Sequence, residues 1–312
     1  MPLANGTPSE RPKQQQSELL NPISSNRKGL AVTQGDSDSV LYQELLQIAR
    51  QAAQAAVELI YTHRPSSFRV EQKSSATDHV TEMDLASEHL IRQIISTHRP
   101  QDLVIGEETP SDSLDNLASS SSVTWFVDPI DGTTNYVYDL PGYAVSIAAQ
   151  IDGRTVAGVV ADPTHARTYE ATLGGGGFCN SQALRPRPET AHSNRDLIAT
   201  ALVATGFSYS AQRRAHQGAV IAQLLPQIRD LRRMGSAALD LCSVAAGRVD
   251  AYFEVGLSTW DSAAGELIAT EAGARVGTLD PNGAAKNGII AASPQLFEPL
   301  RELLWRLGAG QV

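Results

Sequence analysis

The sequence has no run of about 18 apolar residues, so we expect no membrane-spanning helix among its 312 residues. Its first residues also lack the apolar segment that a secretory signal peptide requires. Only two cysteines occur, Cys179 and Cys242, and they form no C-x-x-C motif. We therefore expect reduced thiols in a cytoplasmic protein rather than a disulfide framework. Aromatic residues make up only 5% of the chain, so its core must consist mainly of Ala, Val, Leu and Ile.

Several common catalytic motifs are missing as well. The seven histidines show no metal-ligand spacing, which argues against a zinc site. No G-x-S-x-G elbow of a serine hydrolase is present. Glycines 174–177 lack the following Lys-Ser/Thr of a P-loop, so we predict a hairpin turn there. The formal net charge of -9 argues against general affinity for nucleic acid or anionic membranes.

The composition of the chain changes near residue 38. Residues 1–38 are rich in Pro, Ser, Gln, Asn and Gly and are predicted to form a disordered tail. Residues 39–312 are predicted to form one domain, with an α+β half over about 39–185 and an α/β half over about 186–312. Apolar periodicity predicts helices over 41–63, 81–97, 211–225, 236–247 and 260–272, and strands over 103–106, 124–128, 143–151, 156–162, 167–173, 197–204, 231–235 and 250–256. Antiparallel hairpins, such as the one predicted at Asp152-Gly153, combined with helices favour a layered arrangement of sheets and helices.

The most informative segment is WFVDPIDGTTN at 125–135. An apolar strand ends at Asp128, and Pro129 then interrupts strand pairing. Asp131 follows three residues after Asp128, with the Ile130 carbonyl between them. These oxygens can converge on one Mg2+, which prefers oxygen ligands and retains several waters.

The same segment has further possible roles. If a helix follows it, the N–H groups of Gly132 and Thr133 would face a phosphate. A plain turn that closes a strand is an equally simple interpretation of the segment on its own. A calcium loop is excluded, because the third position from Asp128 is Ile130 and the twelfth is Asp139.

Three other acidic segments allow either a ligand role or a local structural role. Glu107 follows the apolar strand 103–106, where sites gather in layered α/β folds, but a solvated turn is the alternative. Asp261 opens a predicted helix, and its alternative role is that of an N-cap. Thr81 and Asp84 precede another apolar helix with the spacing of a capping box.

Together these segments resemble the inositol monophosphatase family over about residues 40–305. The most specific stretches are WFVDPIDGTTNY (125–136), GFCNSQAL (177–184) and AYFEVGLSTWDSAAG (251–265). The resemblance implies a layered αβαβα sandwich of the α+β class, a homodimer and inhibition by lithium. It also implies a phosphatase with two or three Mg2+ per site that acts on a small phosphorylated polyol, first of all inositol monophosphate.

The resemblance assigns a role to each motif residue. The implied metal ligands are Glu107, Asp128, the Ile130 carbonyl, Asp131 and Asp261. The implied catalytic residues are Glu107, Thr133 and Asp84, and the implied substrate contacts are Asp131, Gly132, Thr133, Ala237, Glu254 and Asp261, with Ser236 and Lys73 as further candidates. One Mg2+ would activate a water that Glu107 and Thr133 orient, and a second would bind the leaving group.

Two alternatives stay open. Relatives in the same superfamily act on histidinol phosphate, fructose 1,6-bisphosphate or 3′-phosphoadenosine 5′-phosphate, and the shared metal core does not separate these substrates. A regulatory protein associated with nucleic acid or polymerase could also retain the fold, with a basic patch formed by Arg213, Arg214, Arg229, Arg232 and Arg233. The complete carboxylate set and the acidic net charge argue against this second alternative, so no nucleic-acid partner is expected.

Overall fold

The computed structural model of the chain describes residues 34–65, 70–72, 79–108, 123–187, 194–281 and 288–310. Its helices are α1 (Gln34–Thr62), α2 (Glu82–His98), α3 (Thr133–Val137), α4 (Asn194–Thr200), α5 (Ala211–Leu224), α6 (Ala237–Ala245), α7 (Thr259–Glu271) and α8 (Pro294–Arg306), with a short 3-10 helix η2 (Leu225–Gln227) after α5.

The strands form three sheets. The large sheet has the order β3 (Leu103–Gly106), β4 (Val123–Asp131), β5 (Ala144–Ile151), β6 (Arg154–Asp162), β7 (Arg167–Thr172), β8 (Gly176–Cys179) and β9 (Gln182–Ala183). The second sheet has the order β11 (Asp230–Arg232), β10 (Leu202–Thr205), β12 (Ala251–Val255), β14 (Gly288–Ala292) and β13 (Arg275–Thr278), and a small hairpin pairs β1 (Val70–Gln72) with β2 (His79–Thr81). In the large sheet only β3 and β4 run parallel, so their carboxyl ends lie side by side.

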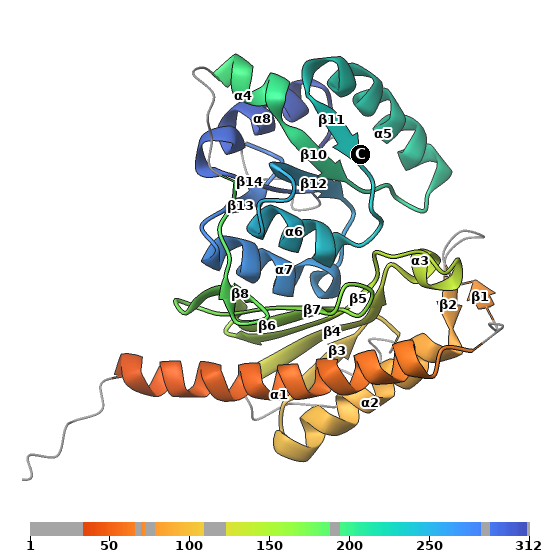
Figure 1. Ribbon diagram of the computed structural model, residues 1–312, viewed down its shortest axis with the longest axis vertical. Helices are drawn as coiled ribbons and strands as arrows, with labels where there is room; N and C mark the ends of the chain where they lie inside the picture. The colour runs from red at the N-terminus through yellow and green to blue at the C-terminus, as the bar shows by residue number, and fades with distance from the viewer. Residues whose placement is uncertain are drawn as a thin grey trace, which may run out of the picture.

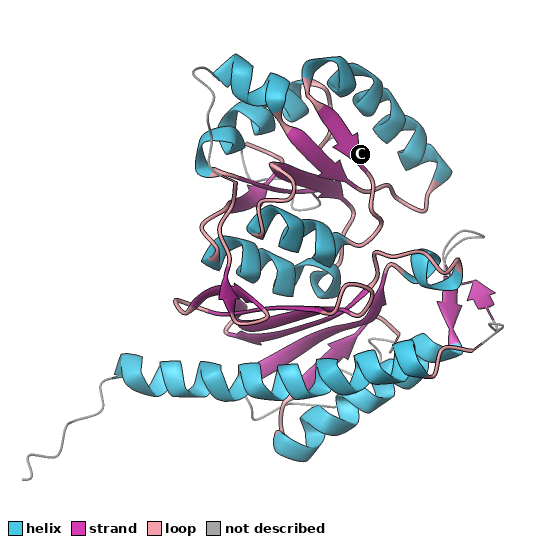
Figure 2. Ribbon diagram, viewed as in Figure 1, coloured by secondary structure: helices cyan, strands magenta, loops and turns pink. Residues whose placement is uncertain are grey.

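The main elements stack in alternating layers of helix and sheet (Figures 1 and 2). Helices α1 and α2 cover one face of the large sheet, and α6 and α7 lie between the large sheet and the second sheet. Helices α4, α5 and α8 cover the outer face of the second sheet. The predicted αβαβα sandwich is therefore confirmed.

Hydrophobic residues fill each interface between layers, as burial of apolar surface requires. The middle layer is rich in alanine: Ala238, Ala245, Ala263, Ala264 and Ala269 are all buried between the sheets. Small side chains let α6 and α7 lie close to both sheets, which agrees with a core built mostly from aliphatic residues.

Most predicted elements are present, but one was wrong and several were missed. Residues 197–200 are predicted as strand but form part of α4, and the strand β10 begins only at Leu202. A short apolar run fits a strand or a buried helix equally well, and packing of α4 against α8 favours the helix here. The sequence pattern also predicted no element after residue 272, where β13, β14 and α8 follow.

Helix α1 begins at Gln34, inside the segment 1–38 for which a tail is predicted. The remainder of that segment, the polar loop 109–122 and Lys73 lie outside the described residues. Among the residues that are described, we find no helix long and apolar enough to cross a membrane. The turn predicted at 174–177 is present at 173–175, but Gly176 and Gly177 already belong to β8; the predicted Asp152-Gly153 hairpin joins β5 to β6.

Candidate functional site

The acidic segments that contain Glu107 and Asp128 meet at the carboxyl ends of β3 and β4. Because these strands are parallel and Gly106 pairs with Val127, Glu107 and Asp128 follow at the same sheet edge. The Glu107 N–H donates to the Val127 carbonyl at 3.1 Å and so keeps the two strand ends together. Glu107 and Asp128 therefore lie side by side at the ends of these two strands.

The loop at the end of β4 forms a turn and also carries the predicted metal ligands Asp128 and Asp131. Pairing with β5 is interrupted between Asp128 and Asp131, as expected for a Pro129 that cannot donate to the ladder. The Ile130 N–H donates to Asp128 Oδ1 at 3.1 Å, which is the Asx turn that was the simpler interpretation. Gly132 then adopts φ +94°, and a Cβ there would lie 2.7 Å from the Gly142 carbonyl, so only glycine fits.

Asp84 joins the start of α2 to this loop. Its Oδ2 accepts hydrogen bonds from the N–H and Oγ1 of Thr81 at 2.8 and 2.6 Å, so the predicted capping box is present. Its Oδ1 lies 3.2 Å from Thr133 Oγ1, and that hydroxyl also lies 3.0 Å from the Ile130 carbonyl. Asp84 therefore has both the structural role and a place beside the predicted catalytic threonine.

The start of α6 holds Asp131. Ser236 Oγ donates to Asp131 Oδ2 at 2.6 Å, and the Ala238 N–H donates to the same oxygen at 2.8 Å. These bonds join residues more than 100 positions apart, and they place a carboxylate at the positive end of a helix. Ser236 and Ala237 are predicted substrate contacts; the structure shows that the start of this helix also orients a predicted metal ligand.

The start of α7 holds Asp261. This residue is not the N-cap considered from sequence, because Ser258 occupies that position. Asp261 lies one turn into the helix, and its Oδ2 accepts from the Ser258 N–H at 2.7 Å. The helix packs closely on its neighbours: a Cβ on Gly265 would lie 2.8 Å from the Leu241 side chain, and one on Gly158 would lie 3.0 Å from Ala264 Cα. Small residues therefore bring Asp261 near the sheet edge that carries Asp128.

The acidic side chains at this edge strongly affect one another. Burial raises the pKa of Asp128 well above its ordinary value, and the charges of Glu107, Asp131 and Asp261 raise it further. Burial likewise raises the pKa of Asp131 to about 6, although the Ser236 hydrogen bond opposes the shift. The pKa of Asp261 rises to about 8, by burial and then by the charge of Asp131.

Among the described residues, no basic side chain is paired with these three aspartates. Within the described ranges, no Lys, Arg or His forms an ion pair with Asp128, Asp131 or Asp261. Burying several carboxylates together without a cation is costly, so the arrangement favours binding of a positive ion.

The donor chemistry fits Mg2+. The available groups are carboxylate and carbonyl oxygens, which hard cations prefer, and sulfur or imidazole ligands are absent from this edge among the described residues. In the described part of the chain, no three acidic, His or Cys side chains are already arranged to hold an ion. One oxygen of each of Asp128, Asp131 and Asp261 accepts a hydrogen bond from the protein, so each carboxylate is oriented before any ion binds.

Glu254 lies at the end of β12, in the second sheet. Its Oε2 accepts from the Tyr252 hydroxyl at 2.8 Å. Burial raises the pKa of Glu254 to about 7, and the charges of Asp131 and Arg233 act on it in opposite directions. Glu254 therefore belongs to the electrostatic surroundings of Asp131, as its predicted role in substrate binding requires.

A further acidic residue near the site, Asp240 on α6, was not among the residues predicted from sequence. Its side chain is buried, no donor among the described residues reaches its Oδ1, and burial with the charge of Glu254 raises its pKa well above the ordinary value. The available signal was a carboxylate inside the otherwise apolar helix sequence AALDLCSVA.

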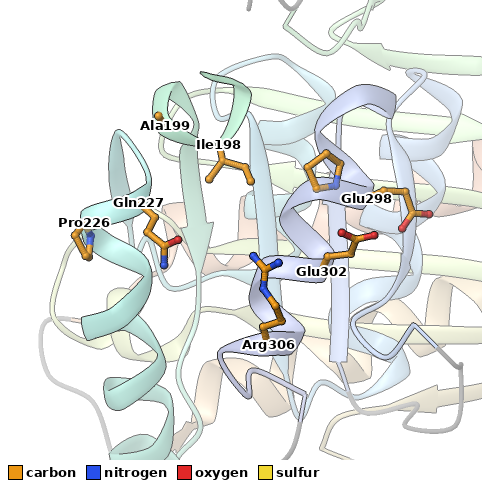
Figure 3. Close-up of a pocket in the computed structure, with 8 residues that line it drawn as sticks. Ile198, Ala199, Pro226, Gln227, Glu298, Glu302 and Arg306 are labelled. Atoms are coloured by element: carbon orange, nitrogen blue, oxygen red, sulfur yellow. The ribbon is translucent and has the colours of Figure 1, made fainter. Parts of the chain in front are cut away.

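A separate groove of about 560 Å³ lies on the outer face of the second sheet, between α4, η2 and α8 (Figure 3). Its Glu298 forms ion pairs with Arg275 and Arg301 at 2.6 Å, so this carboxylate is compensated. Glu302 and Arg306 line the same groove and are exposed. None of the predicted site residues lines this groove, and the acidic edge of the large sheet remains the candidate site.

Comparison with known proteins decides the family. A model described as the inositol monophosphatase family matches residues 41–309. The chain belongs to the inositol monophosphatase family. This match covers the sandwich except for the first seven residues of α1, and it includes every motif residue of the acidic edge.

Individual family members are similar over most of their length. Inositol-1-monophosphatase SuhB of Mycobacterium tuberculosis is 46% identical over 238 residues, 76% of this chain and 81% of that protein. Nus factor SuhB of Escherichia coli is 41% identical over 261 residues, 82% of this chain and 94% of that protein. The crystal structure of extragenic suppressor protein suhB from Bartonella henselae has a TM-score of 0.75 and 30% identity, covering 86% of this chain and 100% of that one.

Proposed function

We propose that this member of the inositol monophosphatase family is an Mg2+-dependent phosphomonoesterase, which hydrolyses inositol monophosphate or a similar small polyol phosphate. The observation that supports the proposal is a group of carboxylates beside Glu107: Asp128 and Asp131 are buried, Asp261 is half-buried, and none of the three forms an ion pair with a described basic residue. The name of the M. tuberculosis relative, inositol-1-monophosphatase SuhB, favours the same substrate class.

The proposed ligands are Glu107, Asp128, the Ile130 carbonyl, Asp131 and Asp261, for two or three Mg2+. Bound Mg2+ would neutralise the phosphate dianion, lower the pKa of a water and stabilise the leaving alkoxide. The carboxylates of Asp128, Asp131 and Asp261 are already oriented by protein donors, which reduces the reorganisation that metal binding requires.

Thr133 and Glu107 are proposed to orient the attacking water. The single hydroxyl proton of Thr133 can go to Asp84 Oδ1 or to the Ile130 carbonyl, and its lone pairs remain able to accept from a water. Glu107 would then accept a proton from that water as general base. The N–H groups of Gly132 and Thr133, at the start of the short helix α3, are proposed phosphate donors.

The polyol part of the substrate is proposed to contact Ala237 and Glu254, with Ser236 as a further candidate. Glu254 can accept hydrogen bonds from hydroxyl groups, which suits a polyol. Lys73, outside the described residues, stays a predicted contact at the edge of the site.

A substrate panel tests this proposal. Phosphate release is measured with inositol 1-phosphate, histidinol phosphate, fructose 1,6-bisphosphate and 3′-phosphoadenosine 5′-phosphate, each with Mg2+ and with EDTA. We expect Mg2+-dependent release that is fastest with inositol 1-phosphate. Preference for another substrate would place the chain in a sister branch, and no release from any of them would refute the phosphatase proposal.

A regulatory role is the second candidate, because the E. coli relative is named Nus factor SuhB. The structure weakens the basic patch considered from sequence: Arg232 forms an ion pair with Asp230 at 2.7 Å, and Arg229 donates to the Thr200 carbonyl. Binding to RNA is tested by titration at low and physiological salt. Affinity that disappears at physiological salt would indicate only nonspecific contact.

Because the chain belongs to the inositol monophosphatase family, we further propose that it forms a cytoplasmic homodimer and that lithium inhibits it. Light scattering during size exclusion tests the dimer. Lithium titration at constant Mg2+ tests the inhibition, and activity unchanged by lithium would refute it.

A further inference from the structure

One face of α2 is polar although it is buried. Asp84, Ser87 and Glu88 are almost fully buried, and Arg92 follows Glu88 by one helical turn. Residues three or four positions apart lie on the same face of a helix, so these side chains form one row. Buried polar and charged groups need hydrogen-bond partners, and this row finds them at the ends of β3 and β4.

The first two members of the row contact the loop after β4. Asp84 Oδ1 accepts from Thr133 Oγ1 at 3.2 Å, and Ser87 Oγ donates to the Pro129 carbonyl at 3.2 Å. These contacts fix the loop that carries Asp128 and Asp131.

The last two members hold the end of β3. Glu88 Oε2 accepts from the Glu108 N–H at 2.8 Å, and Glu88 Oε1 accepts from Arg92 Nε at 2.8 Å. Arg92 Nη1 in turn donates to the Val104 carbonyl at 2.7 Å. The pair therefore binds the backbone on both sides of Glu107.

Gly106 makes this arrangement possible. A Cβ at this position would lie 2.3 Å from the Glu88 carboxyl carbon, so the carboxylate occupies the space that any other residue would need. Gly106 does not adopt positive φ. The requirement for glycine therefore comes from the close approach of Glu88 and not from the backbone conformation.

We propose that Glu88 is a positioning residue for Glu107. The buried carboxylate bonds to the Glu108 N–H, is fixed itself by Arg92, and so sets where the Glu107 side chain points. The inference rests on the proposed function, since Glu107 matters as a metal ligand and general base only if that function is correct. Charge-assisted hydrogen bonds of this kind are strong and directional, and outer residues that orient ligands commonly affect metal affinity and activity 10–100-fold.

The first test replaces Glu88 by glutamine. Glu88→Gln keeps the shape but loses an acceptor, because the amide nitrogen cannot accept from Glu108 or Arg92. We expect kcat to fall about 10–100-fold with KM changed less than about threefold, and the half-saturating Mg2+ concentration to rise about tenfold. Glu58→Gln, an exposed substitution on α1 with the same chemical change, should leave all of these values unchanged.

A readout independent of activity separates positioning from mere stability. The increase in Tm on adding Mg2+ should be smaller in Glu88→Gln than in the wild type. A lower Tm in EDTA combined with unchanged kcat and unchanged Mg2+ dependence would overturn the proposal. If the wild type binds Mg2+ but releases no phosphate, the proposed function fails while the Tm comparison still tests Glu88; if the wild type shows no Mg2+ effect, both fail.

The second test uses Gly106→Ala and Glu88→Ala, separately and together. Alone, Gly106→Ala must displace the Glu88 carboxylate, so we expect losses of kcat and Mg2+ affinity similar to those of Glu88→Ala. In the Glu88→Ala background the space is free, and adding Gly106→Ala should cost less than about threefold more. Effects that multiply fully in the double variant would show that Gly106 does not act through Glu88 and would refute the proposed arrangement.

Discussion

The two sides of the acidic site hold their carboxylates in different ways. On the side of β3 and β4, the strand ends set where Glu107 and Asp128 lie, and side chains from α2 fix the surrounding backbone. On the side of α6 and α7, backbone N–H groups and a serine hydroxyl at the helix starts orient Asp131 and Asp261.

The difference shows how a layered fold can build a site for cations from acidic residues. Parallel strand ends bring carboxylates together, which raises their pKa values by burial and repulsion. Helix N-termini favour the ionised forms, because their N–H groups carry partial positive charge. Asp131 belongs to both sides, since it ends β4 but is held by the start of α6.

Asp131 links the two sides of the site, so Asp131→Asn should cause the largest loss of activity among the variants considered. The amide keeps an oxygen that can accept from Ser236 or Ala238, so the fold should survive, but the negative charge is lost. We expect kcat/KM to fall about a thousandfold or more, because a proposed ligand shared between metal ions is removed. Circular dichroism is the control for folding, and near-normal activity in a folded variant would contradict the assignment of Asp131.

The pH dependence of stability should distinguish the charged site from the rest of the protein. The pKa values of Asp131 (about 6) and Asp261 (about 8) lie above their ordinary value of 3.8, so the folded metal-free protein binds more protons than the unfolded chain. The contribution of these groups to the free energy of unfolding is therefore full below about pH 4 and falls as pH rises toward 8. For Asp131 the shift corresponds to about 3 kcal/mol.

Thermal unfolding in EDTA between pH 4 and 8 checks this expectation. Asp261→Asn should stabilise the metal-free protein at pH 8 and have little effect at pH 4. The increase in Tm produced by Mg2+ should also grow with pH, because protons compete with the metal for the carboxylates. A Tm difference between Asp261→Asn and wild type that does not change with pH would contradict the raised pKa.

Ser236→Ala tests the α6 side alone. It removes the hydroxyl that donates to Asp131 and also caps α6 through the Leu239 N–H, at 3.2 Å. We expect about a tenfold loss of kcat together with about 1 kcal/mol of stability. Ser236→Thr should restore most of the activity because it keeps the hydroxyl.

A matched variant separates the two effects of Ser236→Ala. Ser210 caps α5 in the same way, with its hydroxyl accepting from the Arg213 N–H, but it makes no contact with the acidic site. Ser210→Ala should lower stability and leave kcat unchanged. Equal loss of kcat in both variants would mean that Ser236 acts only through stability.

The smallest expected effect is that of Glu254→Gln. This residue lies on the second sheet and is proposed to contact the alcohol part of the substrate, so we expect a change of about three- to tenfold in the ratio of kcat/KM between polyol substrates. Since the pKa of Glu254 is raised to about 7, the wild-type preference should change across neutral pH and that of the variant should not. An equal loss of kcat/KM for every substrate would show that Glu254 does not take part in substrate recognition.

The sequence by itself determined the elements with strong periodicity and the residues that can carry the chemistry. Local sequence patterns predict the two long helices α1 and α2, the β5–β6 hairpin and the acidic strand end at 125–131. The capping box of Thr81 and Asp84 was also visible, because both partners lie within one helical turn. Such features depend on local sterics and hydrogen bonds, which short sequence patterns record.

Tertiary structure decided everything that depends on partners far apart in the chain. Residues 197–200 became part of a helix through packing against α8, although their apolar run also fits a strand. Asp131 received its donors from Ser236 and Ala238, and buried Glu88 received its role from the backbone of Glu108. The physical reason is that a buried carboxylate must find hydrogen-bond donors, and only the folded layers determine which donors are within reach.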